Sequence, residues 1–467
     1  MKPRPFQFLD VPRRLPKELP ANVRVLGWQE IYGGFDAAGA AEQGARCLDC
    51  GNPYCEWKCP VHNPIPDWLA LVREGRLFEA AELAHSTNPL PEVCGRVCPQ
   101  DRLCEGDCTL NTGFEAVTIG SIEKYIVDEA FRQGWRPDLS AVRATGRRVA
   151  VVGAGPAGLA CADRLVRAGI EAHVFDRHAQ VGGLLTYGIP AFKLEKSVMD
   201  IRRAVLEGMG VRFHLGTEVD AALGGELLRD FDALFLGTGA TTPVDAGLPG
   251  QALPGVLSAL PFLVANARRQ RGERHADDPA IELAGRRVLV LGGGDTAMDC
   301  VRSALRLGAA QVTCAYRRGE ADMPGSRREV KNARDEGVRF LFHRQPLAIE
   351  GAGQATGVRL VETRAAAGRG GAIETVPGSE QVEGADVVIL SFGFRASPAP
   401  WWGEHGIALD GAGRVRTDGT SGATSHPKAF AGGDNVRGAD LVVTAVHDGR
   451  EAAHAIARKL GPGNRVG

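Results

Sequence analysis

The stretch RRVAVVGAGPAGLACADRLVRAG, residues 147–169, decides how the chain is interpreted. It contains an apolar run, a glycine-rich turn and an amphipathic segment, the order of a buried strand, a tight turn and a helix. Gly153 permits the turn, Gly155 lets the backbone approach a pyrophosphate, and Gly158 lets the helix pack close to the strand. The unpaired N–H groups of the first helical turn then face the phosphates. The stretch therefore predicts a dinucleotide-binding fold.

The residues around this turn extend the predicted site. Pro156 and Ala157 lie inside the glycine motif, and the next predicted strand, EAHVFD, ends at Asp176. A carboxylate at that position accepts hydrogen bonds from a ribose hydroxyl. A glycine motif alone is a weak signal, but strand, helix and acid together favour cofactor binding over a plain glycine turn.

A second copy of the same unit follows at 286–316, as RRVLVLGGGDTAMDCVRSALRLGAAQVTCAY. Its second strand ends at Arg317 and Arg318 instead of at an acid. Guanidinium groups there suit a 2′-phosphate, so we expect NADP(H) rather than NAD(H); the alternative is a solvated basic turn. The predicted nucleotide-binding residues of this unit are Gly292, Gly294, Asp295, Thr296, Ala297, Arg317 and Arg318.

The composition limits the possible classes of protein. A chain of 467 residues, 44% apolar and 24% charged, is long enough for two to four globular domains. Its 55 basic residues against 56 acidic ones show no basic excess, so we expect no nucleic-acid partner. The sequence has no run of 18 apolar residues and no signal-peptide core at its start, which predicts a cytoplasmic protein without membrane association.

The cysteines are concentrated near the start of the chain. Eight of the 11 lie in CLDCGNPYCEWKCP (47–60) and CGRVCPQDRLCEGDC (94–108). A zinc site normally pairs two short C-x2–4-C knuckles, whereas iron–sulfur runs end on Cys-Pro. The spacing therefore favours two [4Fe–4S] clusters, with zinc, free thiols or disulfides as the alternatives. Apolar residues at helical spacing in 65–85 and 118–134 predict a small helical domain around them.

Two dinucleotide folds in one chain resemble the flavoprotein disulfide-reductase superfamily, in which the first fold holds FAD and the second the nicotinamide. LFLGTGA (234–240) and AFAGGDNVRGADLVVTAVHDGREAA (429–453) resemble its closing strand and its C-terminal flavin motif. The resemblance places Asp434 near the ribityl chain and a helix N-terminus, from about Val443, at the flavin ring. Reductases of that superfamily carry a redox-active cysteine pair; here Cys161, Cys300 and Cys314 are expected to be buried hydrophobes.

Nearly the whole chain resembles the small (β) subunit family of NADPH-dependent glutamate synthase, and it is similar to the N-terminal half of dihydropyrimidine dehydrogenase. The matching segments, in family order, include CLDCGNPYCEWKCP, VTIGSIEKYI, GGLLTYGIPAFKL and AYRRGEADMPGSRREV. The resemblance implies that NADPH reduces FAD, which passes single electrons to the clusters. It further implies a large (α) subunit carrying FMN that makes L-glutamate from L-glutamine and 2-oxoglutarate. The expected FAD residues are Gly153, Gly155, Pro156, Ala157, Gly158, Asp176, Gly183, Leu184, Gly239, Gly433, Asp434, Thr444 and Ala445.

The resemblance also implies how the cysteines are shared between two clusters. Cluster one would take the first three cysteines of the first run and the last of the second: Cys47, Cys50, Cys55 and Cys108. Cluster two would take Cys59, Cys98 and Cys104, with a fourth ligand that is either Glu123 or Cys94. We favour Glu123, and the spacing leaves Cys94 open. No side chain is expected to act as a general acid or base.

The fold class expected is α/β: two Rossmann-like dinucleotide-binding domains preceded by a helical iron–sulfur domain. The predicted limits are 1–140 for the helical domain, 141–270 with 391–467 for the FAD domain, and 271–390 for the NADPH domain. GAGQATGVRL (351–360) and TRAAAGRGGAIETV (363–376) predict hairpin strands joined by a loop, and 264–284 a boundary. Two alternatives to the glutamate synthase function remain: the NADPH-binding subunit of a ferredoxin:NADP oxidoreductase, and a redox-inactive scaffold subunit.

Overall fold

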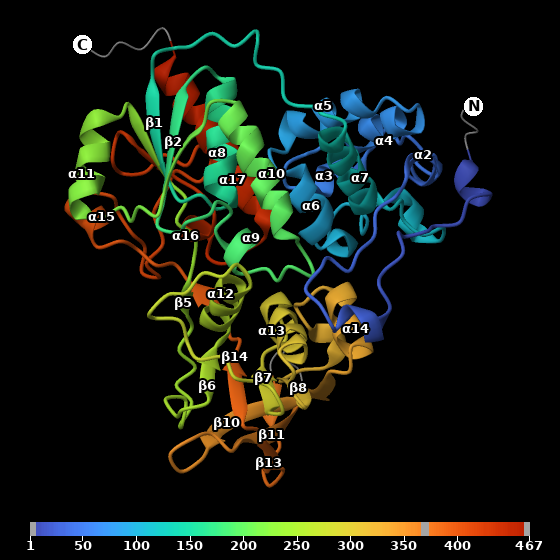
Figure 1. Ribbon diagram of the computed structural model, residues 1–467, viewed down its shortest axis with the longest axis vertical. Helices are drawn as coiled ribbons and strands as arrows, with labels where there is room; N and C mark the ends of the chain where they lie inside the picture. Colours follow the sequence, from blue (N-terminus) through green and yellow to red (C-terminus); the bar gives the residue numbers. More distant parts are fainter. Residues whose placement is uncertain (1–5, 366–372, 462–467) are drawn as a thin grey trace.

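The computed structural model describes residues 6–365 and 373–461, which form a helical region and two α/β regions (Figure 1). The helical region lies beside the first α/β region, and the second α/β region lies below both in that view. Two parallel sheets with a helical region before them confirm the predicted fold class. No helix in the described ranges is long and apolar enough to cross a membrane.

The helical region has a core of small and aliphatic side chains around Trp68, which is fully buried. The segment 65–85, expected to be helical throughout, forms two helices because Gly75 adopts a φ of +75° between them. The elements of this region are η1 (Gln7–Leu9), α1 (Ala21–Arg24), α2 (Ala37–Gly44), α3 (Tyr54–Lys58), α4 (Ile65–Arg73), α5 (Leu77–Thr87), α6 (Pro91–Val97), η2 (Gln100–Arg102), η3 (Thr109–Thr112) and α7 (Ile119–Arg132).

The first α/β region is built on a parallel sheet of strand order β16-β4-β1-β2-β3. Its central strands are continuous apolar runs because helices cover both faces of the sheet. Helices α8 and α17 pack together on one face, and α11 covers the other (Figure 1). The elements are β1 (Arg148–Val152), α8 (Pro156–Arg167), β2 (Glu171–Asp176), α9 (Leu184–Tyr187), α10 (Lys196–Gly208), β3 (Arg212–Leu215), α11 (Ala221–Asp230), β4 (Ala233–Leu236), α15 (Trp401–Glu404), β16 (Ala429–Ala431), α16 (Asp434–Arg437) and α17 (Val442–Leu460).

The second α/β region repeats this plan with a parallel sheet of order β6-β14-β7-β8-β9. The predicted hairpin strands form an antiparallel sheet below it, and the loop predicted within 363–376 lies largely outside the described residues. The elements are β6 (Val256–Ser258), α12 (Ala259–Gln270), β7 (Arg287–Leu291), α13 (Asp295–Arg306), β8 (Gln311–Tyr316), η4 (Glu320–Asp322), α14 (Arg327–Asp335), β9 (Arg339–Phe342), β10 (Arg344–Glu350), β11 (Gly357–Ala365), β12 (Ile373–Thr375), β13 (Gln381–Gly384) and β14 (Val387–Leu390).

The strand pairing places the predicted limit between the FAD and NADPH domains earlier in the chain than residue 271. β6 and α12 precede residue 271, yet β6 pairs with β14 and α12 packs against α13 of the second region. The chain crosses between the two regions at β5 (Thr242–Pro243) and β15 (Phe394–Arg395), which pair antiparallel. The charged composition of 264–284 therefore marks an exposed helix end and the loop after it, because the first residues of that segment belong to α12.

The three cysteines outside the two runs are buried, as expected. Cys161 lies in α8, Cys300 in α13 and Cys314 in β8, and each has no exposed surface. Burial in these apolar surroundings raises the pKa of all three thiols, so each packs as a small hydrophobe.

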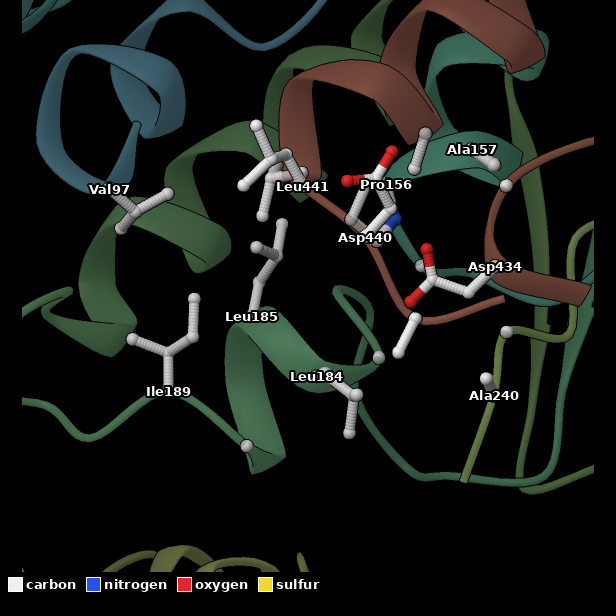
Figure 2. A pocket seen from close by; sticks show the side chains of 18 of the residues that line it. Val97, Pro156, Ala157, Leu184, Leu185, Ile189, Ala240, Asp434, Asp440 and Leu441 are labelled. Atoms are coloured by element: carbon white, nitrogen blue, oxygen red, sulfur yellow. The ribbon is translucent and has the colours of Figure 1, made fainter. Parts of the chain in front are cut away.

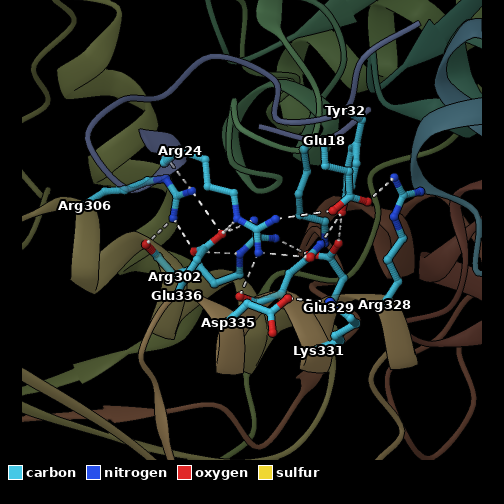
Figure 3. Close-up of polar contacts among 12 residues, drawn as sticks. Glu18, Arg24, Tyr32, Arg302, Arg306, Arg328, Glu329, Lys331, Asp335 and Glu336 are labelled. Carbon is cyan, nitrogen blue, oxygen red and sulfur yellow. Dashed lines mark hydrogen bonds and ion pairs between the residues drawn. The ribbon is translucent and has the colours of Figure 1, made fainter. Parts of the chain in front are cut away.

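A segment before the helical core, residues 17–33, reaches the second α/β region through buried charges (Figure 3). Arg24 pairs with Glu336 at 2.8 Å, and the Tyr32 hydroxyl donates to Glu329 at 2.5 Å. Arg302, whose side chain has no exposed surface, pairs with both carboxylates at 2.7 and 2.6 Å. This buried ionic network joins α13 and α14 to the start of the chain.

The network predicts a large stability effect from one substitution. Arg302→Met should lower the free energy of unfolding by about 3–5 kcal/mol, because Glu329 and Glu336 would stay buried with a cation removed. Urea unfolding followed by circular dichroism measures this as a lower midpoint of the first transition. The control is Arg229→Met, which breaks an exposed pair with Asp230 and should leave that midpoint unchanged. Equal midpoints for the two variants would contradict a stabilising role for the network.

Candidate functional site

One cavity of about 1310 Å³ lies where the helical region and the two α/β regions meet. Most residues predicted to bind FAD line it: Gly153, Gly155, Pro156, Ala157, Asp176, Gly183, Leu184, Gly239, Gly433, Asp434 and Ala445. Gly158 and Thr444 are predicted site residues that do not line it. The cavity is large enough for an extended dinucleotide, and its lining comes from segments far apart in the sequence.

The glycines of the first motif have the steric roles expected of them. Gly153 has a φ of +106°, and a Cβ there would lie 2.4 Å from the Gly237 carbonyl oxygen. A Cβ on Gly158 would lie 1.8 Å from the Gly153 oxygen, so this residue serves close packing of α8 and not the cavity wall. Gly155 differs, because a Cβ added there meets no atom within 4 Å. It faces open space, where a pyrophosphate fits beside the N-terminus of α8.

Asp176 holds the turn as well as lining the cavity. Its carboxylate accepts hydrogen bonds from the backbone N–H groups of Ala154 at 2.7 Å and His178 at 2.8 Å. These two bonds fix the carboxylate at the end of β2, with oxygen lone pairs left over for a ribose hydroxyl.

The N-terminus of α17 faces the same cavity. Leu441, Val442 and Ala445 line it. The helix begins at Val442, one residue before the predicted start at about Val443. Burial raises the pKa of Asp434 to about 7. Thr444 points elsewhere: its hydroxyl donates to the Leu441 carbonyl at 2.7 Å, inside the first helical turn.

Apolar side chains from three segments meet across the cavity, as Figure 2 shows. Val97 comes from α6 of the helical region and faces Leu185, Ile189 and Leu441. Of these residues none was predicted from the sequence. Leu185 and Ile189 belong to the GGLLTYGIPAFKL segment, which the sequence predicts to contribute Gly183 and Leu184 to the site, so the signal for this part of the wall is present in the sequence.

The second glycine motif reaches this cavity through part of its predicted set. Asp295 and Thr296 line it, whereas Gly292, Gly294, Ala297, Arg317 and Arg318 do not. Gly294, like Gly155, has open space where a Cβ would lie, and Gly292 has a φ of +145°. Arg317 is exposed just beyond the end of β8, where an extended nucleotide bound to the second fold would place its ribose.

Further cations line the second-fold side of the cavity, and the sequence did not single them out. They include Lys193, Arg327, Arg328 and Lys331. Lys193 is buried and pairs with Asp299 at 2.8 Å, and its pKa is raised by Asp299 and Glu329 despite the opposing effect of burial. Arg327, Arg328 and Lys331 lie near the start of α14; Arg328 pairs with Glu18 at 3.3 Å and Lys331 pairs with Asp335, whereas Arg327 is exposed.

The cysteines predicted for cluster one surround a separate, small cavity of about 20 Å³ lined by Cys47, Cys50, Cys55 and Cys108 among apolar residues. None of the other cysteines lines it. Burial raises the pKa of Cys47 to about 11 and of Cys55 to about 12. Iron ions would supply the positive charge that buried thiolates need, so the chemistry of this set fits an iron–sulfur cluster.

The residues predicted for cluster two gather on the side of the helical region that faces the first α/β region. Cys59 and Cys98 pack against its apolar core, and Cys98 also lines the large cavity. Burial raises the pKa of Cys59 to about 12, and Glu123 and Cys94 lie near enough to raise it further. Burial raises the pKa of Cys104 well above its usual value, and the nearby Cys59 and Glu123 raise it further. The five predicted residues are therefore neighbours.

Of the two candidates for the fourth ligand in this group, Cys94 is buried and Glu123 is half-buried. Burial raises the pKa of Glu123 to about 8, and in the described ranges no Lys, Arg or His lies within 4.0 Å of its carboxylate. Its hydrogen-bond donor is Asn88, at 3.1 Å. Within those ranges, no three His, Cys, Asp or Glu side chains surround a single-ion position; in a four-iron cluster the ligands bind different irons.

Two family models match consecutive parts of the chain. Residues 24–135 match the dihydropyrimidine dehydrogenase domain II, 4Fe-4S cluster family, and residues 147–449 match the pyridine nucleotide-disulphide oxidoreductase family. Among solved structures, FprA of Mycobacterium tuberculosis in complex with NADPH is 19% identical, with a TM-score of 0.54 over 67% of this chain and 84% of that chain. This likeness shows the fold of the two α/β regions.

Relatives of nearly the same length have higher identity. The glutamate synthase [NADPH] small chain of Escherichia coli is 58% identical over 97% of this chain and 98% of its own length, and that of Halomonas elongata is 58% identical over 97% of both. The putative oxidoreductase AegA of Escherichia coli is 52% identical over 96% of this chain but only 69% of its own length. The matches at full length on both sides establish that the chain belongs to the family of NADPH-dependent glutamate synthase small chains.

Proposed function

We propose that the chain is the electron-input subunit of a glutamate synthase: it oxidises NADPH and delivers the electrons to a large subunit that carries FMN. The large subunit uses them to make L-glutamate from L-glutamine and 2-oxoglutarate. When bound, FAD supplies hydride acceptance and one-electron release, and two [4Fe–4S] clusters supply one-electron conduction. The protein contributes binding, orientation and exclusion of water, and no side chain is needed as a general acid or base.

The observation that carries this proposal is the shared lining of one cavity. Gly155 of the first fold, Thr296 of the second fold and Cys98 of the helical region all line it. A nucleotide on the second fold and a flavin on the first would therefore meet in one cavity. The apolar residues Val97, Leu185 and Leu441 would keep water from the reacting groups.

The same lining supports an order for the two proposed clusters. Cys98, a proposed ligand of cluster two, borders the flavin cavity, whereas the four residues of cluster one border a separate cavity. Cys59 and Cys55 are four residues apart at α3, so the two clusters would share one short segment. The residues proposed to hold cluster two would therefore place a one-electron carrier nearer the flavin cavity than those proposed to hold cluster one.

Two relatives bear on which protein accepts the electrons from this chain. The small chains of equal length support a glutamate synthase large subunit, while AegA, named only as a putative oxidoreductase, shows that the same chain type occurs within a longer protein. Tagged chain, isolated from its own cells under mild conditions, should bring down a large FMN protein. That complex should form glutamate from glutamine and 2-oxoglutarate with NADPH. Recovery of a small flavoprotein that reduces ferredoxin would instead support the ferredoxin:NADP oxidoreductase alternative.

The two glycine motifs predict separable losses. Gly155→Val should fold but lose its flavin, because the side chain would fill the space for the pyrophosphate and meets no protein atom at Cβ. Gly294→Val should keep its flavin and be reduced less efficiently by NADPH, with the apparent KM raised about tenfold or more. Flavin absorbance after gel filtration and NADPH-dependent reduction of an artificial acceptor measure both effects.

Each of these variants is the control for the other, since both place valine at the N-cap of a helix. Gly153→Val is a poorer test, because its positive φ and the Gly237 oxygen would disturb the fold itself. Full flavin content in Gly155→Val would contradict the assignment of the first fold.

The basic residues after β8 predict the nucleotide preference. Arg317→Ala should raise the Kd for NADPH about 10- to 100-fold, the effect of losing one charged hydrogen bond to the 2′-phosphate. The Kd for NADH should stay unchanged, because NADH lacks that phosphate. Fluorescence titration of both nucleotides measures this, with Arg212→Ala as a control at an exposed site on β3 of the first fold. Equal weakening of both nucleotides would rule out the phosphate contact.

A further inference from the structure

Asn88 lies between the two residues that compete to be the fourth ligand of cluster two. It occupies the turn between α5 and α6 and is only 1% exposed. Its side-chain N–H donates to the Glu123 carboxylate at 3.1 Å, and its side-chain oxygen accepts from the Cys94 thiol at a sulfur–oxygen distance of 3.7 Å. One amide therefore contacts both candidates with opposite ends.

The orientation of this amide is fixed by the backbone. The Leu90 N–H donates to the same side-chain oxygen at 3.1 Å, so the oxygen faces Leu90 and Cys94, and the nitrogen faces Glu123. The turn itself is held by Arg450 of α17, which donates to the carbonyl oxygens of Thr87 and Val61, each at 2.8 Å. Reversing the amide would place its N–H groups against the Leu90 N–H, which is unfavourable in a dry site.

We propose that Asn88 is a positioning residue that presents Glu123 to cluster two and holds Cys94 away from it. The inference rests on the ligand set of the proposed function. Glu123 is a half-buried carboxylate with no cation within 4.0 Å in the described ranges, and a bound iron would supply the missing charge. The Asn88 N–H aims the carboxylate by engaging one of its oxygens, which leaves the other for the metal.

Asn88 also holds Cys94, as a thiol that donates a hydrogen bond and not as a metal-binding thiolate. Its thiol points its hydrogen at the Asn88 oxygen, so its sulfur is directed to the amide while that bond lasts. The Cys98 backbone N–H donates to the Cys94 carbonyl at 3.1 Å, which places Cys94 close to a proposed ligand without making it one. Without Asn88, Cys94 would be free to replace Glu123. An iron–oxygen bond would then break, an iron–sulfur bond would form, and the thiol proton would pass to the released carboxylate.

The test uses the flavin- and cluster-containing protein, purified without oxygen and reduced with dithionite. Electron paramagnetic resonance records the g values of each cluster, and iron analysis records occupancy. Cys94→Ala should leave the cluster-two signal unchanged, and Glu123→Gln should change or abolish it. Asn88→Leu, which removes both hydrogen bonds at similar volume, should move that signal to new g values with full iron content.

The ligand exchange is checked by removing the incoming ligand. Adding Cys94→Ala to Asn88→Leu should prevent the new signal and speed loss of iron to a chelator about tenfold or more. Asn88→Asp should keep the acceptor for Cys94 but repel Glu123, so it should lose cluster two without new g values. Asn266→Leu, at another buried asparagine in α12, is the matched control and should leave both signals unchanged.

The outcomes separate the inference from the proposed function. Unchanged g values and iron-loss rates in Asn88→Leu and Asn88→Asp, with a changed signal in Glu123→Gln, would overturn the role of Asn88 alone. An unchanged signal in Glu123→Gln would overturn the ligand set itself. A changed signal in Cys94→Ala would make Cys94 the ligand and overturn both.

Discussion

The arrangement of the whole site depends on one backbone contact between α8 and α17. A Cβ on Gly449 would lie 2.0 Å from the Ala157 carbonyl oxygen, so the two helices touch without side chains between them. This close crossing brings the N-termini of both helices to one cavity, where the partial positive charges of their unpaired N–H groups add. A pyrophosphate at α8 and a flavin ring at α17 can then belong to the same molecule. Any larger residue at 449 would separate the two ends.

The next residue along α17 extends the same contact to the helical region. Arg450 is buried and donates to the Val61 and Thr87 carbonyls, which lie two residues after Cys59 and one before Asn88. A guanidinium group has five donors in a rigid plane, so it can hold two backbone segments at a fixed separation. One turn of α17 thus contacts the first fold on one side and, on the other, the backbone beside the residues proposed for cluster two. Rigid placement of this kind suits electron transfer, because no cofactor has to move.

The second fold is held by charge instead of by backbone contact. The buried ionic network of Arg24, Arg302, Glu329 and Glu336 joins it to the start of the chain (Figure 3), and Arg102 of η2 donates to the Pro324 carbonyl at 2.9 Å. Burying such ions costs desolvation free energy that hydrophobic residues would not, so they are weak evidence for stability as such. Their geometry does specify one orientation of the second fold over the cavity. That orientation decides whether a bound nucleotide faces the flavin.

Local sequence patterns predicted the parts of this arrangement that depend on neighbouring residues. The glycine turns, the strands at 148–152 and 171–176 and the two groups of cysteines follow from spacing, because each is specified within about 30 residues of chain. The cavity wall formed by Val97, Ile189 and Leu441 was not predicted, since side chains from three regions meet there without a shared period. The crossing at β5 and β15 was missed for the same reason: a two-residue strand has too little pattern to detect. Asn88 was missed because an asparagine in a turn is ordinary until its partners are known.

The comparison of the two glycine turns shows how one motif serves two ligands. Both have a glycine with positive φ at the turn and an open glycine at the helix N-cap, so the protein surface offered to a pyrophosphate is alike in the two folds. They differ at the end of the following strand. Asp176 is held by two backbone N–H groups and presents a fixed acceptor, which suits a ribose hydroxyl and repels a phosphate. Arg317 is exposed at the matching position and presents donors on a long side chain, which suits a phosphate that arrives from solution. On the proposed assignment, the resident cofactor and the exchanging substrate would be distinguished by the charge and the exposure of one residue in each fold.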